Sequence, residues 1–249
     1  MTIGREDFAI LDKFGFETPP VGVKFTIKRP DAVERLDKVM TLCEMLRYAQ
    51  DGNAFYADND NHTCDAGLYI LGQEEIAEPY YNGQYGTGLG IFESPRTGTR
   101  LYQHVPKIDE RQIHYIMFSP LDKLNFEPDV LVITANNSQA EILLRASSYK
   151  TGSMWNSKYT AAIGCAWLLV YPYLYGEMNY VPTGLGFGMR RRKLYSEGLF
   201  LMSFPFDMLP SLLQTLKEMP WVPEPYKPDG LTYINKMRRE LGLESDVLT

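Results

Sequence analysis

The order of motifs along the chain repeats itself, and this repeat constrains the fold more than any other feature of the sequence. Each copy runs from an apolar strand through a helical stretch to a glycine, then to a cysteine, and closes on a strand that ends at proline. The matched positions are residues 20–25 and 128–133, Gly52 and Gly152, Cys64 and Cys165, and Pro120 and Pro205. Self-similarity at such a long period predicts a duplicated domain rather than a solenoid. We expect two related halves, residues 19–125 and 127–218, and a helical appendage at residues 219–249.

Strand and helix patterns alternate within this repeat. The predicted strands are residues 21–28, 111–118, 130–135 and 199–204, and the predicted helices are 5–15, 31–50, 64–71, 138–148, 208–219 and 231–241. This alternation predicts an α/β or α+β fold, packed as one unit. Two glycine-rich segments, 78–100 and 178–193, occupy equivalent positions in the two halves. Long loops of this kind are often functional.

Composition narrows the class of protein. With 249 residues, 45% of them hydrophobic, the chain can bury a sizeable core. Its net charge of −6 argues against nucleic acid as a partner. No apolar run is long enough to span a membrane, and the N-terminus lacks a secretory signal pattern. Three cysteines are too few for a disulfide scaffold, so we expect a cytoplasmic protein.

The cysteines are the candidate metal ligands. Cys64 and Cys165 each follow a loop and open a predicted helix, where the helix N-terminus favours the thiolate. Cys43 lies on the apolar stripe of its helix. The three thiols could hold a 4Fe–4S cluster between the two halves, with one iron open or with His62 as fourth ligand. Because no Cys-x-x-Cys pair is present, inert packing and thiol chemistry remain alternatives.

The second glycine-rich segment ends in an arginine cluster. Glycines let the backbone approach a ligand closely, and the planar guanidinium groups of arginine bind carboxylate or phosphate. We expect an anionic or iron-bearing cofactor where this segment meets the first one, with Arg190 favoured as the inward cation. A solvated turn is the alternative. The candidate cofactor-binding residues are Gly186, Gly188, Arg190, Arg191, Arg192, Tyr81 and Tyr85.

Three functional hypotheses follow. The first is a redox or metal protein with a cysteine-ligated iron–sulfur site. The second is a binding module for a large anionic cofactor such as a tetrapyrrole, held by tyrosines and arginines. The third is a small-molecule enzyme or scaffold without metal. All three imply a small-molecule or cofactor ligand; the reaction and any homo-oligomer are left open.

Several separate motifs also occur in a characteristic order. They are a Pro-Val-Gly-Val opening at 20–23, Cys-x-Met-Leu at 43–46, a Cys-x-x-Gly helix start at 64–67, Phe-Glu-Pro-Asp-Val-Leu at 126–131, Pro172 with Gly176, Glu177 and Asn179, Gly188 with Arg190, and Phe-Pro-Phe-Asp at 204–207. Together they resemble the uncharacterised prokaryotic family called domain of unknown function 169, over residues 17–217. The resemblance implies no activity. It does imply an anaerobic prokaryotic setting, which favours oxygen-sensitive chemistry.

Overall fold

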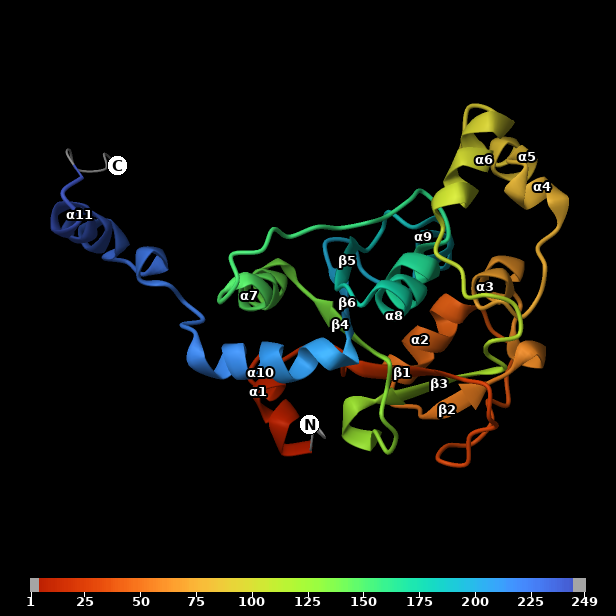
Figure 1. The fold of residues 1–249 in the computed structure, drawn as a ribbon, viewed down its shortest axis with the longest axis horizontal. Coiled ribbons are helices and arrows are strands. Elements are labelled where there is room, and N and C mark those ends of the chain that lie inside the picture. The colour runs from red at the N-terminus through yellow and green to blue at the C-terminus, as the bar shows by residue number, and fades with distance from the viewer. Residues whose placement is uncertain (1–4, 244–249) are drawn as a thin grey trace.

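One antiparallel sheet of six strands organises the chain (Figure 1). The computed structural model describes residues 5–243. The strands lie in the order β2-β3-β1-β4-β6-β5, so the central pair joins the beginning and the middle of the sequence. Their bounds are β1 Val21–Thr26, β2 Phe55–Ala57, β3 Tyr115–Pro120, β4 Val130–Ala135, β5 Asn179–Pro182 and β6 Phe200–Pro205. The predicted mixed α/β class is confirmed.

The central strands are apolar because the sheet is covered where they lie. Every residue of β4 is buried, and Val23 of β1 lies opposite both Phe118 of β3 and Val130 of β4. Gly22, in the Pro-Val-Gly-Val opening, is needed for close packing. A Cβ atom there would come within 2.8 Å of the Leu124 side chain. The opening motif therefore sets the distance between β1 and the chain that leads into β4.

Helices pack on both faces of the sheet. Their bounds are α1 Ala9–Asp12, α2 Leu42–Gln50, α3 Asp65–Ile70, α4 Glu78–Tyr81, α5 Gln84–Gly88, α6 Pro95–His104, α7 Asn137–Ser148, α8 Tyr171–Tyr175, α9 Phe187–Arg192, α10 Leu209–Glu218 and α11 Gly230–Glu240, with a π-helical segment at Ala166–Val170. The segment 78–100, expected as a loop or an interrupted helix, forms α4, α5 and the first part of α6.

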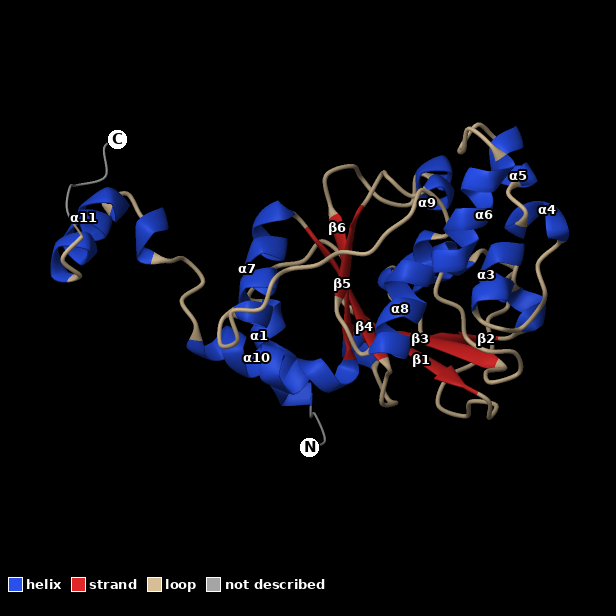
Figure 2. Ribbon diagram, turned by 45° about the horizontal axis from the view of Figure 1, so that its top comes forward, coloured by secondary structure: helices blue, strands red, loops and turns tan. Residues whose placement is uncertain are grey.

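Two apolar cores lie on opposite faces of β4. Val130 and Val132 belong to the core built by α2 and the π-helical segment. Leu131 and Ile133, which alternate with them, belong to the core built by α1, α7 and α10. Figure 2 shows α1, α7 and α10 on one side of β4 and β6, with α8 and α9 on the other. This alternation explains why β4 reads as a continuous apolar run.

The predicted helix over residues 31–50 is wrong over its first part. Helix α2 begins only at Leu42, because Thr41 caps it: the Thr41 hydroxyl accepts from the Glu44 amide, and the Glu44 carboxylate accepts from the Thr41 amide at 2.9 Å. The preceding segment pairs with β2 instead. The Leu36 amide donates to the Tyr56 carbonyl at 2.8 Å, and the Tyr56 amide donates to the Glu34 carbonyl at 2.9 Å.

The strand order is symmetric about the β1–β4 pair, since β3 and β6 flank it and the short β2 and β5 lie at the edges. The order along the chain differs between the halves. Strand β2 precedes the Cys64 segment, whereas β5 follows the Cys165 segment. Duplication of residues 19–125 and 127–218 therefore stays a prediction.

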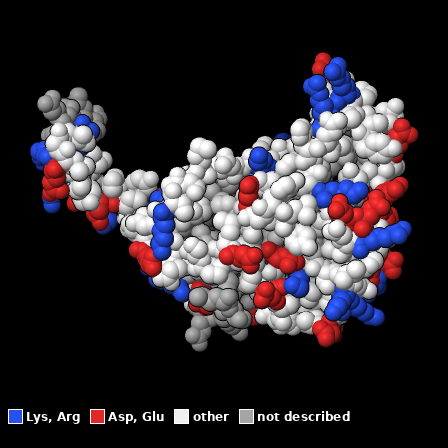
Figure 3. Space-filling model, viewed as in Figure 1, with Lys and Arg blue, Asp and Glu red and all other residues white. Residues whose placement is uncertain are grey.

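Helix α11 lies apart from the sheet and its covering helices in both ribbon views (Figures 1 and 2). The proposed appendage at 219–249 stays a prediction, and its residues 244–249 lie outside the described part. Between residues 5 and 243, no helix combines the length and apolar character that crossing a membrane requires. On the face shown in Figure 3, acidic and basic side chains are interspersed.

Candidate functional site

The three cysteines line one cavity of about 260 Å³, which we call the cysteine pocket. Three parts of the chain meet there: the starts of α2 and α3, the helices α4 to α6, and the segments 162–165 and 186–192. Cys43 lies in the first turn of α2, and Cys64 is the residue that precedes α3. Cys165 precedes the π-helical segment. The cysteine segments and parts of the two glycine-rich segments, residues 80–92 and 186–192, thus lie around one cavity.

The backbone around Cys165 is strained. Ile163 has φ +59°, a left-handed conformation that is unusual for a β-branched residue. The π-helical segment then follows directly after Cys165. The Asn179 side chain supports it by donating to the Trp167 carbonyl at 2.8 Å. Backbone strain and π-helical turns both occur often at functional sites.

The thiols of Cys43 and Cys165 are held in the neutral form. Burial raises the pKa of Cys43, although a hydrogen-bond contact of 3.3 Å with the Thr41 hydroxyl opposes this shift. Burial also raises the pKa of the Cys165 thiol well above its ordinary value, and the nearby thiols of Cys43 and Cys64 raise it further. Taken as whole residues, Cys43 is buried, and Cys64 and Cys165 are both partly exposed.

The expected iron–sulfur site is wrong. Within residues 5–243, no group of three or more histidine, cysteine, aspartate or glutamate side chains is arranged to hold a metal ion. A cluster requires its ligands to converge on one point, and the three thiols line the pocket without converging in this way. His62, the suggested fourth ligand, is buried, and it is not among the residues that line the pocket.

Helices α4 to α6 supply an aromatic wall. The rings of Tyr80 and Tyr85 lie 4.5 Å apart, and the Tyr80 hydroxyl donates to Asp65 at 3.1 Å. Burial raises the pKa of Tyr102 to about 12 and also raises that of Tyr80, so both hydroxyls stay protonated. Phe92 completes this wall. The pocket is therefore largely apolar, with phenol hydroxyls at its margin.

Among the described residues that line the cysteine pocket, Arg192 is the one with a positively charged side chain. Its Nε lies 3.5 Å from the Glu44 carboxylate, and its Nη1 donates to the Gly188 carbonyl at 3.3 Å. Burial would raise the pKa of Glu44, but hydrogen bonds from Thr41 and the charge of Arg192 outweigh this effect and lower it. The cap of α2 and the last turn of α9 are thereby joined at the pocket.

The Tyr159 side chain leaves no room for a Cβ atom at two glycines of the pocket, Gly164 and Gly186. A Cβ atom at Gly186 would lie 2.2 Å from the Tyr159 hydroxyl, and one at Gly164 would lie 2.8 Å from it. That hydroxyl is buried without a hydrogen-bond partner among the described residues, and burial raises the pKa of Tyr159 to about 12. The glycine pattern thus reflects close packing of residues 159–164 against the start of α9.

The predicted site residues divide into two groups. Gly186, Gly188, Arg192 and Tyr85 line the cysteine pocket together with the three cysteines. Arg190, Arg191 and Tyr81 are exposed and do not line it. The sequence reasoning did not single out Phe92, Tyr102 or Tyr159. The high tyrosine content was a signal for Tyr102 and Tyr159, but only the packing around the pocket identifies the individual residues.

Comparisons with known proteins give a family without a function. The model of domain of unknown function 169, described as "Uncharacterised ArCR", matches residues 9–215. An uncharacterized protein of Methanocaldococcus jannaschii, MJ0308, is 27% identical over 156 residues, which cover 61% of this chain and 66% of the relative. No solved structure gives a significant match. The chain belongs to the domain of unknown function 169 family.

Proposed function

We propose that the chain binds a small organic acid with an aromatic or apolar body in the cysteine pocket. The observation that carries this proposal is the lining itself: an aromatic wall from α4 to α6 faces the cysteine side chains and one arginine, Arg192. Ligand sites are commonly of this kind, mostly apolar with a few polar groups that fix orientation.

The charges around the pocket define how the acid binds. The Nε atom of Arg192 lies 3.5 Å from the Glu44 carboxylate, and its Nη1 atom donates to the Gly188 carbonyl. A guanidinium has five N–H donors, so donors remain for a ligand carboxylate. Asp65 also lines the pocket, and the Tyr80 hydroxyl donates to it. The ligand's acid group is therefore expected at the α9 side and its apolar body against the tyrosines.

The size of the pocket favours a small ligand over a macrocycle. Its volume of about 260 Å³ lies just below the ~300 Å³ at which typical ligand pockets begin. A tetrapyrrole needs considerably more room than a single substituted ring. A benzoate-sized molecule suits this volume better.

Calorimetric titration with aromatic carboxylates tests the proposal. Benzoate and phenylacetate are the probes, and benzamide and phenylacetamide are their neutral counterparts. The acids are expected to bind more tightly than the amides. Arg192→Gln should weaken acid binding about tenfold or more, because a hydrogen bond to a charged group is worth ~1.5–3 kcal/mol. Arg191→Gln, a change at an exposed neighbour, is the matched control.

Two results would contradict the proposal. One is equal affinity for acids and amides in the wild-type protein, which would remove the role of charge. The other is equal loss of affinity in the Arg191 and Arg192 variants, which would show a non-specific effect of net charge rather than a contact in the pocket.

A further inference from the structure

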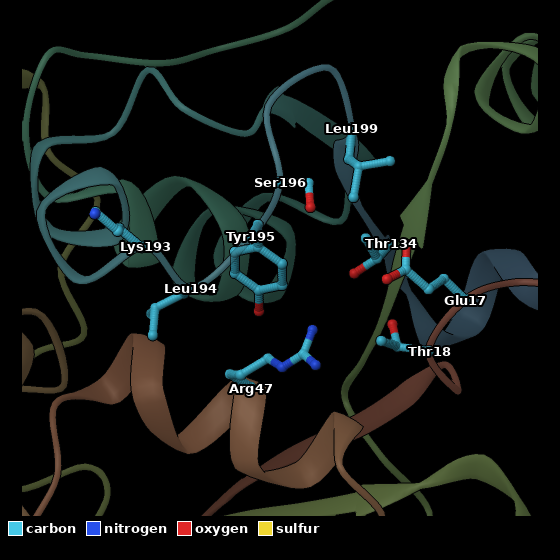
Figure 4. Close-up of a pocket in the computed structure, with 9 residues that line it drawn as sticks. All are labelled: Glu17, Thr18, Arg47, Thr134, Lys193, Leu194, Tyr195, Ser196 and Leu199. Atoms are coloured by element: carbon cyan, nitrogen blue, oxygen red, sulfur yellow. The ribbon is translucent and has the colours of Figure 1, made fainter.

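A second cavity, of about 520 Å³, lies beside residues 193–199, which follow α9 (Figure 4). We call it the Tyr195 pocket, after the tyrosine at its centre. It is lined by residues from four separate parts of the chain: Glu17 and Thr18, Arg47 of α2, Thr134 of β4, and residues 193–199. Unlike the cysteine pocket, it is lined mainly by hydroxyl and charged groups.

Buried hydroxyl groups without partners point to a ligand in this pocket. Thr18 is 6% exposed, and its hydroxyl has no hydrogen-bond partner among the described residues. The Tyr195 hydroxyl is also buried and unpartnered. Burial raises the pKa of Tyr195, so this group is a hydrogen-bond donor. Buried polar groups are nearly always paired, and each exception requires an explanation.

A third unpaired polar group lies directly behind the lining. The Gln50 side chain donates to the Thr134 hydroxyl at 2.7 Å, and its carbonyl oxygen is buried without a partner. A hydroxyl has one donor and two acceptor positions, so Thr134, which accepts this bond, keeps its O–H donor and one acceptor position. If the Gln50 amide is turned the other way, Thr134 donates to it and keeps an acceptor. In either arrangement Thr134 can still bond a molecule in the pocket.

The charged groups give the pocket two chemically different walls. In Figure 4 the Tyr195 hydroxyl and the Arg47 guanidinium lie together, and Thr18, Thr134 and Glu17 face them across the gap. Arg47 contacts Asp51 at 3.0 Å, and its remaining N–H groups can serve a ligand. One wall therefore suits an acid group, and the opposite wall suits an amine.

We propose that the Tyr195 pocket binds a free α-amino acid, with its carboxylate against Arg47 and Tyr195 and its ammonium group against Glu17. Arginine and a phenol hydroxyl are strong donors to a carboxylate. A carboxylate and two threonine hydroxyls offer acceptors for the three N–H bonds of an ammonium group. Leu194 and Leu199 also line the pocket and can contact an apolar side chain of the bound amino acid.

Calorimetric titration of the full chain tests this proposal, with the standard L-amino acids, acetate and ethylamine as probes. At least one amino acid is expected to bind at least tenfold more tightly than acetate or ethylamine. Tyr195→Phe and Glu17→Gln should each weaken that binding about fivefold or more. Tyr149→Phe, which removes a hydroxyl from an exposed tyrosine, should leave it unchanged.

The stability of the ligand-free variants gives an independent readout. Because the Thr18 and Tyr195 hydroxyls lack partners, Thr18→Val and Tyr195→Phe should not lower the Tm of the free protein. A saturating amino acid should raise the Tm of the wild type by more than that of either variant.

Three results would overturn the proposal. They are the absence of binding by any amino acid, acetate binding as tight as the best amino acid, and amino-acid binding unaffected by Tyr195→Phe and Glu17→Gln. None of these results bears on benzoate binding, because the aromatic acid is expected in the other pocket and depends on Arg192.

Discussion

Acidification should destabilise the protein through a single histidine. His62 is 9% exposed, and neither ring nitrogen has a hydrogen-bond partner among the described residues. Burial lowers the pKa of His62 from 6.5 to about 4, although the negative charge of Asp58 opposes this shift. The folded protein therefore holds His62 neutral at pH values where the unfolded chain would protonate it.

The size of the effect follows from proton linkage. Below pH 6.5 the unfolded state binds a proton that the folded state does not bind until about pH 4, so stability falls as the pH falls between these values. The full difference corresponds to about 3.4 kcal/mol, because one pKa unit is 1.36 kcal/mol. About 2 kcal/mol of it should already be lost on going from about pH 7.5 to about pH 5.

Urea unfolding at these two pH values measures the effect. The free energy of unfolding should fall with acidification by about 2 kcal/mol more in the wild type than in His62→Leu, which cannot titrate. His104→Gln, a change at an exposed histidine, serves as control and should behave like the wild type. The measured quantity is the difference in unfolding free energy between the two pH values for the same protein. A pH-independent change in packing caused by the substitution therefore cancels. Identical pH dependence in the wild type and His62→Leu would refute the reasoning.

Three further predictions concern the cysteine pocket. Thr41→Ala removes the side-chain cap of α2 and should lower the free energy of unfolding in urea by about 1 kcal/mol. Thr41→Ser keeps a capping hydroxyl and should retain most of the wild-type stability, so equal losses in the two variants would contradict the capping role. Gly186→Ala should lower the Tm because its Cβ meets the Tyr159 hydroxyl at 2.2 Å, and Tyr159→Phe should partly restore it; strictly additive losses would refute the clash. N-ethylmaleimide should modify Cys64 before Cys165, because burial raises the pKa of the Cys165 thiol and only the thiolate reacts. Peptide mass spectrometry measures the order, and modification of Cys165 first would show that thiol protonation does not control the reactivity.

Local signals in the sequence were sufficient for most of the sheet. The strand predicted at 130–135 coincides with β4, and those at 21–28 and 199–204 correspond to β1 and β6. The helix predicted at 31–50 was started too early, because its apolar spacing continued upstream of the true start at Leu42. The capping pair Thr41 and Glu44 was visible in the sequence, but it competed with that spacing. Pairing of residues 34–36 with β2 decided the outcome, and such long-range contacts leave no local pattern.

The sequence singled out several residues that line the cysteine pocket, but not its chemistry. Cys64, Cys165 and the two glycine-rich segments were selected by the order of motifs, and the structure brings parts of them around one cavity. Whether a thiol ionises depends on burial, which only the packed structure gives. The Tyr195 pocket had no sequence signal, because its groups come from separate segments and none belongs to a motif.

The short outer strands have a consequence for how this protein can associate. An open sheet edge is a template on which a strand from another chain can pair. Here residues 34–36 already hydrogen-bond to the outer side of β2. At the other edge, the Ser157 hydroxyl donates to the Tyr180 carbonyl of β5, and the Asn179 side chain bonds both the amide and the carbonyl of Lys158. Loops of the chain therefore lie against both outer strands, and strand addition at either edge would first require these loops to move away.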